Sequence, residues 1–174
     1  FLFSQKNLDI KMKSDSIVID GTINELEWEN SVIAENFVEI NPGNNSPSKT
    51  RTEVQVSYDT ENLYVAFHSF DNPELIRANQ SKRDDIEDDD RVIISIDPRN
   101  DGVVEHYFSS NPLGNQLDGQ KFGNSDRNNW DAIWYSSGRI VKNGYEVEIA
   151  SPFSTFRSVN TDDLHWRINF SRFI

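Results

Sequence analysis

The sequence of 174 residues contains no cysteine, and it carries 29 Asp and Glu against 17 Lys and Arg. The length suits one domain with a substantial core, and the lack of cysteine excludes disulfide bonds, thiolate zinc sites and a lipidated N-terminal cysteine. The formal net charge of -12 repels nucleic-acid phosphates and anionic membrane surfaces, so the composition favours cations and neutral ligands as partners.

The first five residues, FLFSQ, are similar to the end of the apolar core of a signal peptide. We therefore expect residues 1–15 to comprise an export remnant and a leader strand, although an ordinary apolar tail fits the same residues. Residues 16–174 are then expected to form a single domain. No other apolar stretch of the sequence is long enough to span a membrane as a helix.

Helix is scarce in this sequence. The one clear candidate spans residues 24–31, where Asn24 is a suitable N-cap and where Leu26 and Trp28 are expected to pack inward. A second short turn is expected at residues 152–156. The segment 41–48 is rich in Asn and Pro and is expected to be a surface loop.

Apolar and polar residues alternate with a period of two along much of the chain, which is typical of strands with one buried face. Residues 52–58 and 63–67 flank turn residues and are expected to form a hairpin. The nearly continuous apolar run at 92–96 suits a strand buried between two layers. Further strands are expected at residues 103–108, 144–149 and 166–170. The pattern predicts an all-β protein, an antiparallel and jelly-roll-like β-sandwich with one or two short helices.

Six carboxylates crowd into the seven residues 84–90, directly before the buried strand. A bound Ca²⁺ would offset their mutual repulsion, because this ion takes oxygen ligands in flexible geometry. We therefore expect Asp88, Asp89 and Asp90 to be candidate ligands of a structural calcium ion. A solvated acidic loop is the alternative, since most runs of charge are hydrated.

No arrangement of residues in the sequence favours catalysis. The three histidines, His68, His106 and His165, are far apart, and no nucleophile motif such as GxSxG is present. Glu146 and Glu148 alternate on one expected strand and are expected to face solvent or to form salt bridges. A glycosidase needs two carboxyl groups that face each other across a sugar cleft. The sequence therefore predicts that the domain is not an enzyme by itself.

Exposed tryptophans are a common surface on which a sugar ring stacks, and this chain has four tryptophans. Trp28 and Trp166 lie in apolar patterns and are expected in the core. Trp130 follows a polar loop, so that both the core and the rim of a binding site fit its position. Trp134 is likewise open to both interpretations.

Several short motifs follow one another in a defined order along the chain. They are Ile19-Asp20-Gly21 with Glu25 and Trp28, YDTENLYV at 58–65, DRVIISID at 90–97, GYEVEIA at 144–150 and WRINF at 166–170. In this order they resemble the family 9 carbohydrate-binding module, and the likeness runs from about Ile17 to the end of the chain. The resemblance implies a β-sandwich that binds a glycan without catalysing a reaction.

A second set of motifs is similar to the amino-terminal module of a group of exported outer-membrane proteins. These motifs are Arg83-Asp84, Asn111-Pro112-Leu113-Gly114 with Asp118, Trp130-Asp131, and Pro152-Phe153 with Arg157. This resemblance implies export to the periplasm, outer membrane or cell surface of a Gram-negative bacterium. It also implies that the natural chain continues beyond Ile174 into a membrane-associated β region.

The sequence departs from characterised sugar-binding members of the family at three matching positions. Glu87 stands where those members have an aromatic platform, Ile93 where they have a ligand-contacting Glu, and Ser109 where they have a ligand-contacting Arg. We therefore predict a non-catalytic carbohydrate-binding module of a larger exported protein. Its candidate sugar contacts are Trp130, Trp134 and Asn111. The alternative is an interaction domain that has lost sugar binding and docks on an adjoining envelope region.

Overall fold

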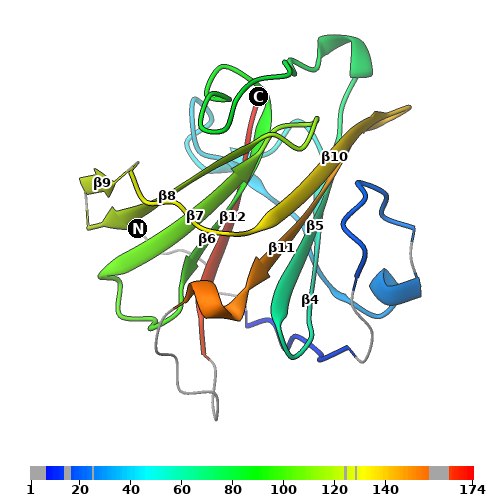
Figure 1. Cartoon of the computed structure of the whole chain (residues 1–174). Coiled ribbons are helices and arrows are strands. Elements are labelled where there is room, and N and C mark those ends of the chain that lie inside the picture. Colours follow the sequence, from blue (N-terminus) through cyan, green and yellow to red (C-terminus); the bar gives the residue numbers. More distant parts are fainter. Residues whose placement is uncertain (1–6, 14–16, 25, 124, 128, 157–164) are drawn as a thin grey trace.

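Two five-stranded antiparallel sheets face each other (Figure 1) in the computed structural model, which describes residues 7–13, 17–24, 26–123, 125–127, 129–156 and 165–174. Sheet I has the order β1 (Val32–Ala34), β4 (Thr52–Tyr58), β5 (Asn62–Phe70), β11 (Gly144–Pro152) and β10 (Tyr135–Val141). Sheet II has the order β12 (Arg167–Phe173), β6 (Arg91–Asp97), β7 (Val104–Ser110), β8 (Gln116–Phe122) and β9 (Ser125–Arg127). The predicted all-β, antiparallel fold is confirmed.

Period-two alternation sends one side chain of each successive pair into the space between the sheets. Sheet I contributes Val54, Val56, Leu63, Val65, Phe67, Tyr145, Val147 and Ile149 to this core. Sheet II contributes Val92, Ile94, Ile96 and Phe108. Every run that the sequence marks as a strand forms one, and the expected hairpin is β4–β5.

The remaining described elements are short. Strands β2 (Val38–Glu39) and β3 (Ser46–Pro47) form a small hairpin. β3 lies inside the expected surface loop at residues 41–48, and β2 directly precedes that loop. The 3-10 helices η2 (Pro73–Leu75) and η3 (Phe153–Thr155) have three residues each, and η3 lies at the expected second turn. No helix within the described ranges is long and apolar enough to cross a bilayer.

The segment from Ile17 to Trp28 covers part of the outer face of sheet I. Ile17 and Trp28 pack there in a second, smaller cluster with Tyr64, Ala66 and Ala150. In place of the helix expected at residues 24–31, the structure has the three-residue 3-10 helix η1 (Leu26–Trp28). So short a helix packs only one of its sides against the sheet. The inward packing of Trp28 is confirmed at 3% exposure, whereas that of Leu26 is wrong, since its side chain is 76% exposed.

Glu148 on β11 is the clearest departure from the expected orientation of the strand residues. The prediction that it faces solvent is wrong, because its side chain is fully buried beneath the segment from Ile17 to Trp28. Its carboxylate accepts hydrogen bonds from the Gly21 amide at 2.8 Å and the Trp28 Nε1 at 2.9 Å. Glu146 does form the expected salt bridge, with Arg139 at 3.0 Å.

The expected export remnant at residues 1–5 lies outside the described residues. Further along the N-terminal segment, Met12 forms an isolated bridge with Tyr58, and the amide of Lys13 donates to the Tyr58 carbonyl at 2.7 Å. These contacts place residues 12 and 13 beside the end of β4. The division of the chain at residue 15 stays a prediction.

Candidate carbohydrate-binding face

Trp134 lies in the core between the sheets and not on a surface. Its side chain is 3% exposed, and its ring meets that of Phe108 edge to face with the centroids 5.4 Å apart. A sugar face needs an accessible ring on which to stack. Of the two interpretations that the sequence left open for Trp134, the structure therefore favours the core.

Trp130 is half-buried and packs against the same core from the segment that precedes β10. Its ring lies edge to face with the rings of His106, at 4.9 Å, and Phe108, at 6.1 Å. The residue thus closes one end of the core while part of its surface faces solvent. Of the three residues predicted as sugar contacts, Trp130 alone has a partly exposed side chain.

Asn111 is fully buried and its side chain is saturated with hydrogen bonds. Its Nδ2 donates to the Asn79 carbonyl at 3.0 Å and to Asp89 at 2.8 Å. Its Oδ1 accepts from the amides of Leu113, at 3.0 Å, and Asn115, at 2.9 Å. These contacts fasten the loop before β6 to the β7–β8 turn, and they leave the predicted sugar contact without a free donor.

Two carboxylates of the acidic loop at residues 84–90, those of Asp89 and Asp90, are buried and have donors from the protein. Asp90 pairs with Arg77 at 3.0 Å, and Asp89 accepts from Nδ2 of Asn79 at 2.7 Å as well as from Asn111. Burial alone would raise the pKa of Asp89, but these hydrogen bonds outweigh it and hold the pKa below its ordinary value. Asp88 is exposed.

Within the described residues, no group of three or more His, Asp or Glu side chains is arranged to hold a metal ion. Calcium binding at Asp88, Asp89 and Asp90 therefore stays a prediction from the sequence. The contacts described above argue against a calcium site, since the carboxylates of Asp89 and Asp90 already have protein donors.

A chelator melt tests the calcium prediction directly. We expect the thermal midpoint to be the same in excess EDTA and in millimolar CaCl₂, because Asp89 and Asp90 gain their partners from the protein itself. A calcium site would instead stabilise the fold by about 2.7 kcal/mol at a free Ca²⁺ concentration about 100 times the Kd of the site. A rise in the midpoint with CaCl₂ that Asp89→Asn abolishes and the surface control Glu61→Gln retains would contradict our expectation.

Arg83 brings together motif residues that lie far apart in the sequence. Its guanidinium pairs with the buried Asp118 and donates to the Ala132 carbonyl at 2.9 Å, while the Ala132 amide donates back to Asp118 at 2.8 Å. Burial raises the pKa of Asp118, partly offset by the Ala132 amide, Trp134 and Arg83. This network fastens the acidic loop to β8 and to the segment before β10, so these motif residues serve the fold.

The outer face of sheet II, turned away from sheet I, offers a different set of side chains. Alternation along the strands places on it Ile93, Ser95, Glu105, Tyr107, Ser109, Leu117, Gly119, Lys121, Arg167, Asn169 and Ser171. Their inward neighbours, among them Ile94, Ile96 and Phe108, form the core. Charged and aromatic groups therefore share one face of the sheet.

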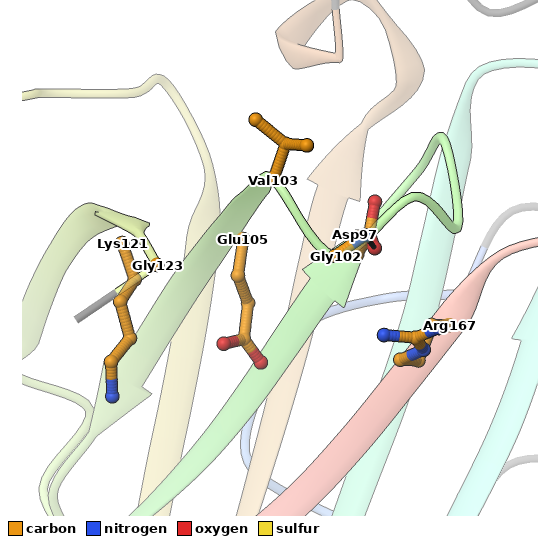
Figure 2. A pocket seen from close by; sticks show the side chains of 7 residues that line it. All are labelled: Asp97, Gly102, Val103, Glu105, Lys121, Gly123 and Arg167. Carbon is orange, nitrogen blue, oxygen red and sulfur yellow. Dashed lines mark hydrogen bonds between the residues drawn. The ribbon is translucent and has the colours of Figure 1, made fainter.

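A hollow of about 130 Å³ lies at one end of this face, and we call it the Arg167 hollow. It is lined by Asp97, Gly102, Val103, Glu105, Lys121, Gly123 and Arg167. Figure 2 shows Glu105 between the ends of Lys121 and Arg167. The strand register explains this placement, since Glu105 pairs with Lys121 and Arg167 pairs with Asp97.

The charged groups of the Arg167 hollow differ in how they are used. Asp97 is buried, and its carboxylate accepts from the amides of Arg99 at 3.1 Å and Gly102 at 2.8 Å, which stabilises the β6–β7 turn. The side chains of Glu105, Lys121 and Arg167 form no hydrogen bond or ion pair with any residue that the structure describes. Three polar ends are therefore available to a ligand.

Tyr107 lies two residues along β7 from Glu105, on the same face. A Cβ atom at Gly119, its partner on β8, would lie 2.2 Å from the Tyr107 hydroxyl oxygen, so the phenol lies across bare backbone. The side chain is half-buried. Burial, followed by the charges of Asp126 and Asp118, raises its pKa. Tyr107 therefore supplies an aromatic surface next to the Arg167 hollow.

The three positions at which the sequence departs from the sugar-binding pattern lie toward the other end of this face. Ile93 and Ser109 pair directly across β6 and β7. Ser109 is fully buried and donates to the Val92 carbonyl at 3.1 Å. Glu87 is exposed and lines a second hollow, of about 270 Å³, within the acidic loop. On the strands, this end offers an apolar side chain and a buried hydroxyl that already donates to the backbone, and the exposed groups beside them are carboxylates of the acidic loop. The Arg167 hollow is where free cationic and anionic side chains occur together.

Among solved structures, a candidate carbohydrate-binding protein from Bacteroides uniformis is similar with a TM-score of 0.65 and 15% identity, over 82% of this chain and 71% of that chain. A family 9 carbohydrate binding module from Caldicellulosiruptor kristjanssonii in complex with glucose has a TM-score of 0.59 and 18% identity, over 92% and 76%. A family 9 carbohydrate binding module from the same organism in complex with cellotriose has a TM-score of 0.58 and 19% identity, over 90% of this chain and 71% of that chain. At these identities the likeness shows the fold.

A search of curated proteins found no match to this sequence. The family described as carbohydrate family 9 binding domain-like matches residues 19–171, which is most of the chain. The match covers both sheets of the sandwich and confirms the resemblance to the family 9 carbohydrate-binding module. The chain belongs to the carbohydrate family 9 binding domain-like family.

Proposed function

We propose that this domain is a non-catalytic carbohydrate-binding module that takes a glycan on the outer face of sheet II. The observation that carries the proposal is the Arg167 hollow, where Glu105, Lys121 and Arg167 have no partner among the described residues. Sugar hydroxyls both donate and accept hydrogen bonds, so they can use one carboxylate acceptor and two cationic donors together. Tyr107 adds an aromatic surface for the apolar face of a sugar ring.

The carboxylates around the hollow support binding without hydrolysis. Glycoside hydrolysis uses two carboxyl groups on opposite sides of the scissile bond, one to donate a proton and one to attack or to activate water. Of the two carboxylates that line the hollow, Asp97 is buried and accepts from two turn amides, which leaves Glu105 alone. A single free carboxylate suits recognition of hydroxyl groups.

We place the domain in a larger exported protein of a Gram-negative envelope. The support for this part is the likeness of its sequence motifs to amino-terminal modules of outer-membrane proteins. In such a protein, glycan binding would hold substrate close to a neighbouring region and raise its effective concentration. Fractionation of cells that produce the full-length natural protein tests the placement: we expect it in the periplasm or outer membrane, and recovery in the cytoplasm would contradict the proposal.

Substitutions on the face test glycan binding. In a glycan array followed by calorimetry, we expect Glu105→Gln and Tyr107→Ala each to weaken the affinity for the best array ligand by about tenfold or more. The first replaces a charged acceptor with a neutral amide, and the second removes the aromatic ring. Tyr107→Phe should retain most of the affinity, since the ring remains.

The matched control is Glu61→Gln, an exposed residue in the β4–β5 turn of sheet I, which should leave the affinity unchanged. Thermal melts of all variants show whether the fold is retained. If no saccharide binds the parent protein, the proposal fails and an interaction domain becomes the better description. If a saccharide binds and neither variant weakens it, the ligand lies elsewhere.

A further inference from the structure

Arg167 differs from every other arginine that the structure describes. Each of the others has an ion pair, a hydrogen bond or an aromatic ring against its guanidinium: these are Arg51, Arg77, Arg83, Arg91, Arg99, Arg127, Arg139 and Arg172. Arg167 has none of these with a described residue. Its Nη1 lies at the bare backbone of Gly102, 3.4 Å from where a Cβ would stand. The guanidinium is therefore placed in the hollow without a partner.

This lack of a partner is unexpected in a chain with a net charge of -12. The register even sets Asp97 opposite Arg167, but that carboxylate accepts from the turn amides of Arg99 and Gly102 and forms no ion pair with Arg167 within 4.0 Å. Lys121 lies opposite both Glu105 on β7 and Asp126 on β9, again without an ion pair. The face thus keeps two cationic groups free despite the surplus of carboxylates.

We infer that the ligand of this face is an acidic saccharide, with the carboxylate of a uronic acid residue bound to the Arg167 guanidinium. A guanidinium can donate two parallel hydrogen bonds to one carboxylate, and these charge-assisted bonds are stronger than hydrogen bonds to a neutral hydroxyl. Glu105 would accept from the sugar hydroxyls, and Lys121 beside it offsets its charge toward the ligand (Figure 2). The inference rests on the proposed function and narrows it to one class of glycan.

An acidic ligand differs from the expectation from composition, which favours cations and neutral ligands as partners. The overall charge acts through solvent and is screened beyond about 8 Å at physiological salt, whereas a bidentate ion pair acts at contact. In the hollow itself the two carboxylates, Asp97 and Glu105, are balanced by Lys121 and Arg167, so the contact between the glycan carboxylate and Arg167 decides the preference.

The test compares trigalacturonate with its methyl ester, which has the same rings and hydroxyls but no charge. By calorimetry, we expect the parent protein to bind the acid about tenfold or more tightly than the ester. Arg167→Gln should remove this preference. Arg167→Lys should retain part of it, because a lysine keeps the positive charge but cannot donate two parallel hydrogen bonds to the carboxylate. The control Arg99→Gln alters an exposed arginine of the adjoining turn and should keep the preference.

The outcomes separate the two proposals. If neutral saccharides bind and the acid gains nothing over its ester, the acidic-ligand inference is wrong while the carbohydrate-binding function stands. A preference for the acid that survives Arg167→Gln also overturns it, since another group would then bind the carboxylate. If neither the acid, nor the ester, nor any neutral saccharide binds, both proposals fail together.

Discussion

Replacing Glu148 with alanine is expected to lower the free energy of unfolding by about 3–5 kcal/mol. The carboxylate is fully buried and accepts from three N–H groups, the amides of Asp20 at 3.0 Å and Gly21 at 2.8 Å and the Nε1 of Trp28 at 2.9 Å. Alanine leaves all three donors facing a cavity under the segment from Ile17 to Trp28. Buried donors without an acceptor are more costly than the net value of the bonds they lose.

Urea denaturation measures the loss, and hydrogen exchange shows where it acts. We expect faster exchange of the Gly21 amide in Glu148→Ala, because the segment from Ile17 to Trp28 loses its polar attachment to sheet I. Trp28→Phe replaces the indole with the smaller phenyl ring and removes one of the three donors, so it should have a smaller effect than Glu148→Ala, about 1–2 kcal/mol.

The matched control is Glu146→Ala, the next outward position on β11. Glu146 has an 11% exposed side chain, but its removal leaves Arg139, whose side chain is 48% exposed and can be hydrated, so the loss should be about 1–2 kcal/mol. Equal losses from Glu146→Ala and Glu148→Ala would contradict the structural role assigned to Glu148.

The strands of the core could be predicted because each carries its own pattern. In Val54 and Val56 on β4, and in Val147 and Ile149 on β11, the apolar residues recur at every second position, which identifies both the strand and its inner face. The outer strands β8 and β10 carry few apolar residues and include Gly119 and Gly138, so this pattern does not mark them. Their place in the sheets follows from pairing with their neighbours.

Alternation shows which face a residue lies on, but not what covers that face. Glu148 was therefore correctly assigned to the outer face of sheet I and wrongly to solvent, since the covering segment lies more than 100 residues earlier in the chain. Asn111 and Trp134 were selected as polar and aromatic residue types, and the structure buries both. A residue type suggests a chemistry, while burial decides whether a ligand can reach it.

The candidate binding face could not be predicted because it depends on the register of three strand pairs. Glu105 meets Lys121 across β7 and β8, Arg167 reaches the same hollow from β12, which pairs with β6, and the pairing of β6 with β7 brings these two pairs together. No spacing in the sequence links Arg167 to Lys121, although each lies in the outward phase of its own strand. The position of the Tyr107 ring likewise depends on Gly119 of the neighbouring strand, since any side chain there would clash with the phenol.

Arg172 on β12 connects the two sheets at the edge of the sandwich. It lies opposite Val92 and so points inward, and its side chain is 6% exposed. The guanidinium crosses to sheet I, where it pairs with Asp71, donates to the Phe70 carbonyl at 3.0 Å and lies 5.2 Å from the centre of the Tyr145 ring. Because β12 pairs only with β6, this contact holds an edge strand against the opposite sheet.

We expect Arg172→Met to lower the free energy of unfolding by about 3–5 kcal/mol, because it leaves Asp71 as a largely buried carboxylate without its partner. Arg167→Met is the matched control on the same strand. It points outward and has no partner among the described residues, so its effect should stay within about 0.5 kcal/mol.

A double-mutant cycle distinguishes the ion pair from simple loss of packing. Asp71→Asn in the Arg172→Met background removes the stranded charge, so the double variant should be less destabilised than the sum of the two single variants, with a coupling of about 1–3 kcal/mol. Urea denaturation of the four proteins supplies the cycle. Additive losses would mean that Arg172 stabilises the sandwich through the packing of its stem and its contact with Tyr145, rather than through Asp71.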